Sequence, residues 1–271
     1  MNDEVRTEKN SAEIIHGHLT KRFLKILIMN GEIFQLFMDI IRSTFSRPFY
    51  FNRLVEQIYH SGRGSLSITI VIGLTMGLVM TLNFGYGLAK FGGTLYVPAV
   101  VSLSLAREMA PLFTSLLVAG RVGSGIAAEI GAMNVTQQVD AIRALGTSPI
   151  RVLVVPRFWA MVISLPLLSS LSFAVGIIGG LIVCKNEFDI TTGFYLTKVF
   201  STVKFHDYMS GLVKSAVFGG IITLVGCYRG LTTRDGTKGV GQSTTWVVVT
   251  SSIWILITDF FISKIFLMIW N

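Results

Sequence analysis

Four ionisable residues lie inside otherwise apolar stretches of the sequence. Arg107 and Glu108 are adjacent in one stretch, Lys214 interrupts another, and Asp259 interrupts a third. A charged side chain near the centre of a lipid bilayer is costly unless it is paired or wetted, and it often marks the path of an ion or a substrate. The chemistry expected of these four residues is therefore non-covalent: ion pairing and the binding of a charged group.

The four residues are predicted to lie at one depth in the membrane. Arg107, Lys214 and Asp259 are about 14 to 16 residues from one end of their stretches, which is roughly 21–24 Å along a helix. Two positive and two negative groups at one level can neutralise each other, so we expect a polar cluster facing the protein interior or a wet cavity. Such a cluster could be a network that only joins helices, a surface that contacts a charged substrate, or both.

Five stretches are long and apolar enough to position these residues on membrane-spanning helices, which need about 20 mostly apolar residues. Of the 271 residues, 51% are hydrophobic and only 14% are charged. Glycines within the stretches, including a GxxxG pair at Gly73 and Gly77, favour close helix packing. The sequence thus predicts an all-α integral membrane protein, with helices at roughly 66–89, 96–120, 158–184, 208–228 and 244–270.

The distribution of Lys and Arg predicts the orientation of these helices. Residues 1–64, 121–157 and 229–243 together hold sixteen of them, whereas the alternate connections hold four. Connections rich in Lys and Arg stay in the cytoplasm, which places the N-terminus inside and the C-terminus outside. Residues 1–22 lack the apolar stretch of a secretory signal. The net charge of +8 fits this bias, and no basic run interleaved with aromatics indicates nucleic-acid binding.

An amphipathic helix is expected before the first span. Its apolar side chains recur at helical spacing, with polar residues on the other face. We expect it to lie in the plane of the cytoplasmic leaflet, with packing on a soluble partner as the alternative. The chain then divides into a cytoplasmic tail with this interfacial helix, 1–64, and a membrane domain, 65–271. The apolar residues are Ile33, Leu36, Phe37, Ile40 and Ile41.

The connection at about 121–157 is expected to carry a short cytoplasmic helix rather than a nucleotide site. No Lys-Ser/Thr follows its first glycines, and a membrane helix precedes them, which excludes a phosphate-binding loop. Residues 134–146 predict an amphipathic helix with Asn134 and Gln137 at its start and Gly146 at its end. The helix buries its apolar stripe either on the membrane domain or in a groove of a cytosolic partner. The stripe is Val135, Val139, Ile142 and Leu145.

The cysteines and histidines predict neither a disulfide nor a metal site. Cys184 and Cys227 are expected near opposite faces of the membrane, and the four histidines are scattered or lie in the tail. A structural zinc site needs about four such ligands at short spacing.

The blocks AREMAP, AGRVGS, AEIGAM and PRFWA follow one another between residues 106 and 160. In these blocks the chain closely resembles the MlaE (YrbE-like) permeases, the membrane subunits of MCE-type ABC transporters. The resemblance is strongest over about 103–180 and extends more loosely over nearly the whole chain. It implies a permease domain at 65–271, made of five transmembrane helices after an interfacial helix, with a cytoplasmic coupling helix between the second and third.

The resemblance also implies partners and a role. Two permease copies would form a homodimer in the inner membrane around a lipid cavity that opens outward. Cytosolic ABC ATPases, which hold the ATP and Mg²⁺, would dock on the coupling segments; a ring of MCE-domain proteins would sit outside, and a STAS-domain protein joins some systems. The chain itself would be no enzyme and would bind no cofactor. The cargo would be phospholipid or a related lipid, moved to import lipids or maintain outer-membrane asymmetry.

Residue roles follow from this resemblance. The intramembrane charged positions of the family match Arg107, Glu108, Lys214 and Asp259. Arg107 and Lys214 could attract a phosphate head group, and apolar residues of the first span could contact acyl tails: Leu74, Leu78 and Leu82. The residues expected to couple to the ATPase are Glu129, Gln137, Val139, Asp140, Ile142, Arg143 and Leu145, although Gln137 stands where Glu is frequent.

Two other classes of function are compatible with the residues alone. In an ion-coupled secondary carrier, Glu108 and Asp259 would relay protons, although five spans do not divide into two equal inverted repeats. In a membrane scaffold that only recruits cytosolic proteins, charges inside the membrane would have no function.

Overall fold

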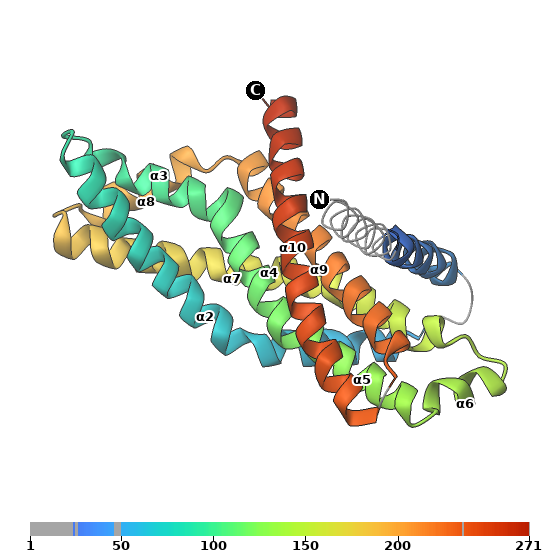
Figure 1. Cartoon of the computed structure of the whole chain (residues 1–271). Coiled ribbons are helices and arrows are strands. Elements are labelled where there is room, and N and C mark those ends of the chain that lie inside the picture. The colour runs from blue at the N-terminus through green and yellow to red at the C-terminus, as the bar shows by residue number, and fades with distance from the viewer. Residues whose placement is uncertain (1–23, 25–26, 46–49, 235, 271) are drawn as a thin grey trace, which may run out of the picture.

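The protein is a bundle of long helices in a computed structural model that describes residues 24, 27–45, 50–234 and 236–270 (Figure 1). Within these ranges all regular structure is helical. The tail at 1–22 and several of the basic residues counted above lie outside them. The helices are α2 Phe51–Ala89, α3 Val97–Ser104, α4 Ala110–Val118, α5 Ser124–Val135, α6 Gln138–Ala144, α7 Val155–Glu187, α8 Thr192–Thr202, α9 Phe205–Thr232 and α10 Gly236–Trp270.

Five helical segments of the described chain are long and apolar enough to cross a membrane, which confirms the five predicted spans. They are longer than predicted because the helices continue past the apolar stretches; α2 alone has 39 residues, about 58 Å, against a hydrocarbon core of about 30 Å. The division between 1–64 and 65–271 consequently falls inside α2. The segments are Phe51–Ala89, Thr94–Val135, Ile150–Glu187, Phe205–Thr232 and Gly236–Ile269.

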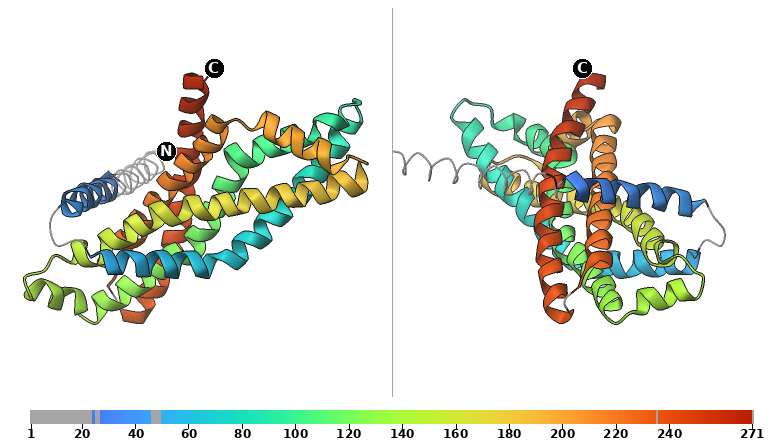
Figure 2. Two further views of the ribbon diagram at one scale, coloured as in Figure 1. Left: turned by 180° about the vertical axis from the view of Figure 1, so that it is seen from behind. Right: turned by 45° about the vertical axis from the view of Figure 1, so that its right-hand side comes forward.

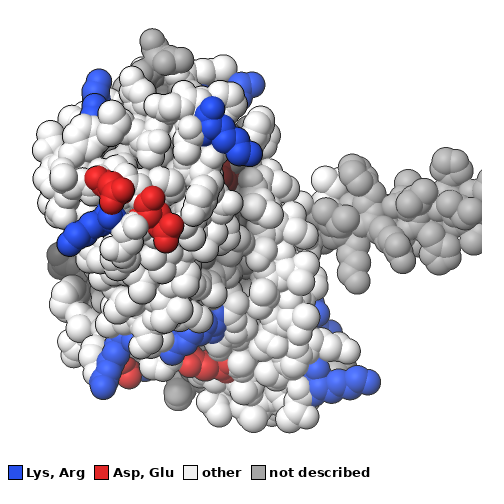
Figure 3. Space-filling view, turned by 90° about the vertical axis from the view of Figure 1, so that its left-hand side faces the viewer, with Lys and Arg blue, Asp and Glu red and all other residues white. Residues whose placement is uncertain are grey.

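Two short helices mark the opposite ends of the bundle. The connection carrying α6 lies at one end, called here the α6 end, and α8 lies at the other, the α8 end (Figure 1). Charged side chains are sparse on the face shown in Figure 3 and gather toward its upper and lower parts. This distribution is expected of helices that cross an apolar layer between two polar boundaries.

Glycines bring α2 and α7 into backbone contact. A Cβ atom on Gly73 would lie 2.6 Å from the carbonyl oxygen of Ser172, and one on Gly77 would overlap the carbonyl oxygen of Gly176. No larger residue fits these positions without separating the helices. The GxxxG pair therefore acts in packing, as the sequence predicted, and its partner surface is the small-residue face of α7.

Residues 27–44 form the predicted amphipathic helix, which crosses α9 and α10 rather than running along them (Figure 2). Leu36 and Ile40 are buried in a cluster with residues of α5, α7 and α9. The Nε1 group of Trp159 donates a hydrogen bond of 3.0 Å to Thr44 Oγ1. The helix thus packs on this chain's own membrane domain, while Ile41 of the predicted apolar stripe is exposed.

The helix predicted at 134–146 is shorter in the structure, where α6 covers Gln138–Ala144. Asn134 belongs to the end of α5, and its side-chain amide donates a 2.9 Å hydrogen bond to the carbonyl of Thr233 instead of capping α6. Gln137 takes a left-handed conformation (φ 62°) that separates the two helices. The predicted capping pair was therefore wrong. Gly146 ends the segment with φ 74°, as predicted.

Candidate functional site

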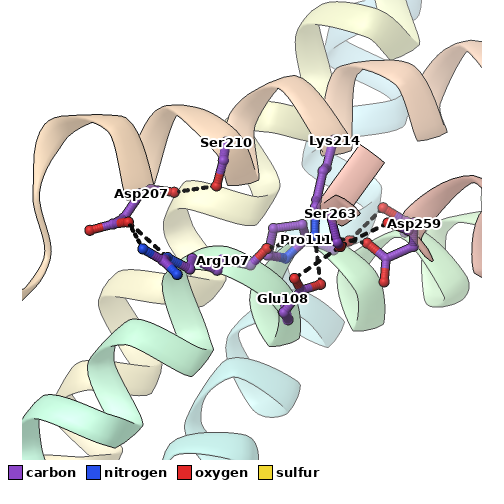
Figure 4. Close-up of polar contacts among 9 residues, drawn as sticks. Arg107, Glu108, Pro111, Asp207, Ser210, Lys214, Asp259 and Ser263 are labelled. Carbon is purple, nitrogen blue, oxygen red and sulfur yellow. Dashed lines mark hydrogen bonds and ion pairs between the residues drawn. The ribbon is translucent and has the colours of Figure 1, made fainter. Parts of the chain in front are cut away.

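Three of the four predicted intramembrane charges meet around the amino group of Lys214 (Figure 4). Lys214 Nζ lies 2.6 Å from Glu108 Oε2 and 3.1 Å from Asp259 Oδ1. It also donates to Ser263 Oγ at 2.6 Å, and Ser263 Oγ donates to Glu108 Oε1 at 3.0 Å. The side chain of Lys214 is only 2% exposed, which means that three helical segments enclose its amino group.

A proline on the second span helps to hold Lys214. Pro111 has no backbone N–H, so the carbonyl of Arg107, four residues earlier, lacks its usual helical donor. The chain forms a π-helical turn, η2 Leu105–Met109, just before this position. Lys214 Nζ lies 3.2 Å from the Arg107 carbonyl oxygen and donates to it. The AREMAP block thus builds a backbone acceptor for the buried lysine as well as a charged partner.

The fourth predicted residue, Arg107, does not join the group around Lys214. Its Nε donates to Asp207 Oδ1 at 2.7 Å, and Nη2 bonds the same oxygen. Asp207 also accepts a 3.0 Å hydrogen bond from the backbone N–H of Lys204, which caps α9. Asp207 was missed because it directly precedes the apolar stretch assigned to this span. Its spacing of seven from Lys214 could have indicated it, since residues seven apart share one helix face.

Both groups of charges border one cavity of about 320 Å³, lined by polar and apolar side chains from the second, fourth and fifth spans. Arg107, Glu108, Asp207 and Lys214 contribute charge, whereas Asp259 is not among its lining residues. A volume near 300 Å³ is at the lower end of small-molecule sites. The remaining lining residues are Leu103, Ser104, Ser210, Ser263, Phe266 and Leu267.

A larger and almost wholly apolar groove of about 610 Å³ lies elsewhere, between helix 27–44 and helices α7, α9 and α10. No charged residue lines it. The three leucines predicted to contact acyl tails line neither cavity. Leu74, Leu78 and Leu82 are half-buried along α2, where the α2–α7 packing covers part of their surface.

The predicted ATPase-coupling residues divide into buried and exposed groups. Val139 is fully buried against Val152 and Leu153, and Ile142 packs on the same cluster. This half of the predicted apolar stripe is therefore covered by this chain, which was one of the two alternatives. Leu145, by contrast, is 81% exposed.

The polar members of the coupling set lie on or near α6. Asp140 and Arg143 form an exposed ion pair with a 2.9 Å N–O distance, and Gln137 is exposed at the break before α6. Glu129 pairs with Arg157 at 2.9 Å and links α5 to α7 within this chain. At the α6 end of the bundle, the surface open to a partner is therefore formed by α6 and Leu145. Glu129 is already paired within this chain.

No group of three or more His, Cys, Asp or Glu side chains is arranged to hold a metal ion in the described part of the chain. Cys184 and Cys227 are both buried free thiols. The site is accordingly a set of paired charges beside a cavity.

These features define a multi-pass membrane protein, with a buried ionic cluster and a cavity between its spans. Comparison with known families identifies the kind: residues 54–265 match the model of the MlaE permease, and the chain belongs to this family. It is an ABC transporter permease subunit, which is not itself catalytic and works with a partner ATPase.

Similar proteins occur in bacteria and in a plant. A probable ABC transporter permease protein of Rickettsia bellii is 38% identical over 252 residues, covering 93% of this chain and 97% of that protein. One from Synechocystis is 42% identical over 243 residues, covering 90% of each. The Arabidopsis thaliana protein named TRIGALACTOSYLDIACYLGLYCEROL 1, chloroplastic, is 35% identical over 217 residues, covering 80% of this chain and 62% of its own length.

Proposed function

We propose that this chain is the lipid-translocating permease of an ATP-driven transporter in the inner membrane of a cell. The observation that carries the proposal is the cavity between membrane-length helices, which exposes charged groups to a ligand inside an apolar bundle. A lipid head group is one kind of ligand that carries charge through such a layer. The name of the Arabidopsis relative, which is that of a glycerolipid, supports the same class of cargo.

In the proposed mechanism the permease makes and breaks no covalent bonds. ATP binding on the partner ATPase moves the α6 connection, and the spans change between two arrangements of the cavity. A ligand or a nucleotide biases such a change only through different affinities for the two arrangements. The ion pairs described above keep the site charged without leaving any charge isolated, which makes a hydrated head group easier to accommodate.

The proposal includes a homodimer and an external ring of MCE-domain proteins, with the N-terminus in the cytoplasm. The resemblance to the MCE-type systems supports the ring, and the Lys and Arg distribution supports the orientation. The exposure of α10 supports the dimer, because only 6% of its most apolar 18-residue stretch is buried, whereas 67% of the corresponding stretch of α9 is buried. An apolar helix face of this extent is available to lipid or to a second copy.

The proposal is tested by reconstituting the permease with its ATPase in liposomes and following a fluorescent phospholipid. We expect lipid movement that requires ATP and stops with an ATPase variant that binds but does not hydrolyse it. Movement that ignores ATP and follows an imposed proton gradient would instead identify a secondary carrier. Absence of both lipid movement and lipid binding would contradict a transport role.

A further inference from the structure

The charges of the site differ in what they present to the cavity. The side chains of Arg107 and Glu108 are 38% and 36% exposed, whereas their partners Asp207 and Lys214 are 3% and 2% exposed. Both exposed groups line the same cavity. The buried partners therefore fix the two side chains, and the cavity offers a ligand one guanidinium and one carboxylate from adjacent residues of η2.

The cluster also carries an excess of negative charge. Arg107 and Asp207 neutralise each other, but Lys214 is shared by the two carboxylates of Glu108 and Asp259. His206 Nε2 lies 3.5 Å from Asp207 Oδ1, on the Arg107 side of the cluster. One uncompensated negative charge thus belongs to the Glu108–Asp259 pair, and only Glu108 of this pair lines the cavity.

Both exposed groups keep hydrogen-bonding capacity for a ligand. Arg107 uses Nε and Nη2 for Asp207, and its Nη1 N–H groups remain available as donors. Each oxygen of Glu108 accepts one hydrogen bond, from Lys214 or Ser263, and each can accept another. A phosphate fits the first site and an ammonium group fits the second, since charge-assisted hydrogen bonds of this kind are the strong ones.

We propose that the cavity selects zwitterionic phospholipids, whose head group carries a phosphate and an ammonium, over anionic ones. Arg107 binds the phosphate, and Glu108 binds the ammonium of an ethanolamine-type head group. A purely anionic head group would satisfy Arg107 but leave the excess charge beside Glu108 uncompensated. The cavity of about 320 Å³ holds the head group, and the acyl chains leave past the apolar side chains that line its wall. This inference rests on the proposed lipid-transport function and specifies its substrate class.

The test measures which lipids the purified transporter complex retains from an equal mixture of phosphatidylethanolamine and phosphatidylglycerol with identical acyl chains. Mass spectrometry of the bound lipid should show a preference of about threefold to tenfold for phosphatidylethanolamine, the range that one additional charge-assisted contact supports. The Glu108→Gln variant keeps Lys214 paired with Asp259, so it should fold, and it should lose or reverse this preference. Arg107→Lys, which keeps the charge opposite Asp207, should reduce retention of both lipids.

Asp259→Asn is the matched control, because it removes the same formal charge from the cluster at a position that does not line the cavity. A preference that is reduced in Asp259→Asn, because the excess charge is gone, but lost completely in Glu108→Gln supports a direct contact of Glu108 with the ammonium group. An equal loss in both variants, or equal retention of the two lipids by the unmodified complex, overturns the inference. Retention of neither lipid would contradict the proposed lipid function itself, so the two failures are distinguishable.

Discussion

The sharing of one buried ammonium by two carboxylates predicts a strongly non-additive effect of their removal. In Glu108→Gln, Lys214 keeps Asp259 at 3.1 Å, and in Asp259→Asn it keeps Glu108 at 2.6 Å. Each single variant therefore leaves one ion pair and an amide oxygen in place of the lost carboxylate. The double variant leaves Lys214, which is 2% exposed, without any anionic partner.

The expected magnitudes follow from this geometry. Glu108→Gln weakens a charge-assisted hydrogen bond, and Asp259→Asn removes an ion pair. Neither leaves Lys214 without an anionic partner, so each should cost about 1 kcal/mol of unfolding free energy. The double substitution isolates a buried cation and should cost about 3–5 kcal/mol. The difference between the double variant and the sum of the singles is then about 1–3 kcal/mol, within the range found for groups that share a network.

The cycle can be measured by unfolding the protein in mixed micelles with increasing dodecyl sulfate and following the fluorescence of its four tryptophans. Lys214→Met in the double-variant background should recover part of the lost stability, because it removes the isolated charge while keeping side-chain volume. Additive single effects, or a double variant as stable as either single, would refute the sharing of Lys214. If Lys214→Met restores no stability to the double variant, this result also contradicts the sharing of Lys214.

Three further predictions concern packing and docking. Gly77→Ala should separate α2 from α7 and lower the free energy of unfolding by about 1–3 kcal/mol. Gly87→Ala on the same helix, where a Cβ meets nothing within 4 Å, should be neutral or slightly stabilising. Equal effects of the two variants in thermal unfolding would contradict the packing argument. Val139→Asp should destabilise the fold by more than about 2 kcal/mol. Leu145→Asp should leave the free energy of unfolding unchanged but reduce the amount of ATPase that copurifies. If Leu145→Asp retains the ATPase fully, the exposed α6 surface is not the docking site. Tyr195→Phe removes the hydroxyl that donates to the Ile177 carbonyl at 3.0 Å and should cost about 1 kcal/mol, with unchanged stability as the contrary result.

The number of spans and the meeting of Glu108, Lys214 and Asp259 could be predicted because both depend on helix geometry alone. Because the rise per residue of a helix is constant, the position of a residue in the chain gives its depth in the membrane. Opposite charges at one depth inside an apolar layer are expected to pair, because an unpaired charge there is costly. Asp207 was outside this reasoning because the predicted span began one residue later. Hydropathy locates the apolar layer, but it does not show how far a helix continues beyond it.

The extent of α6 could not be predicted for a different reason. Asn134 is a good capping residue in isolation, and its spacing from Gln137 matched a capping pattern. In the folded chain its amide binds the carbonyl of Thr233, about a hundred residues later. A contact between distant segments decided where the helix ended, and local propensity could not reveal it. The same limit applies to Val139, whose burial depends on residues of η4, the π-helical turn Ile150–Val154.

The seam between α2 and α7 limits where this protein can bend. Where Gly73 and Gly77 meet α7, backbone lies against backbone, and no side chain remains there whose rotation could absorb sliding. The two helices are therefore expected to move as one rigid unit. Any rearrangement that opens or empties the cavity then has to occur in the other helices. The contacts of α9 and α10 around Lys214 are ionic, and ion pairs can exchange partners. We therefore expect the helices to move relative to one another at the charged site.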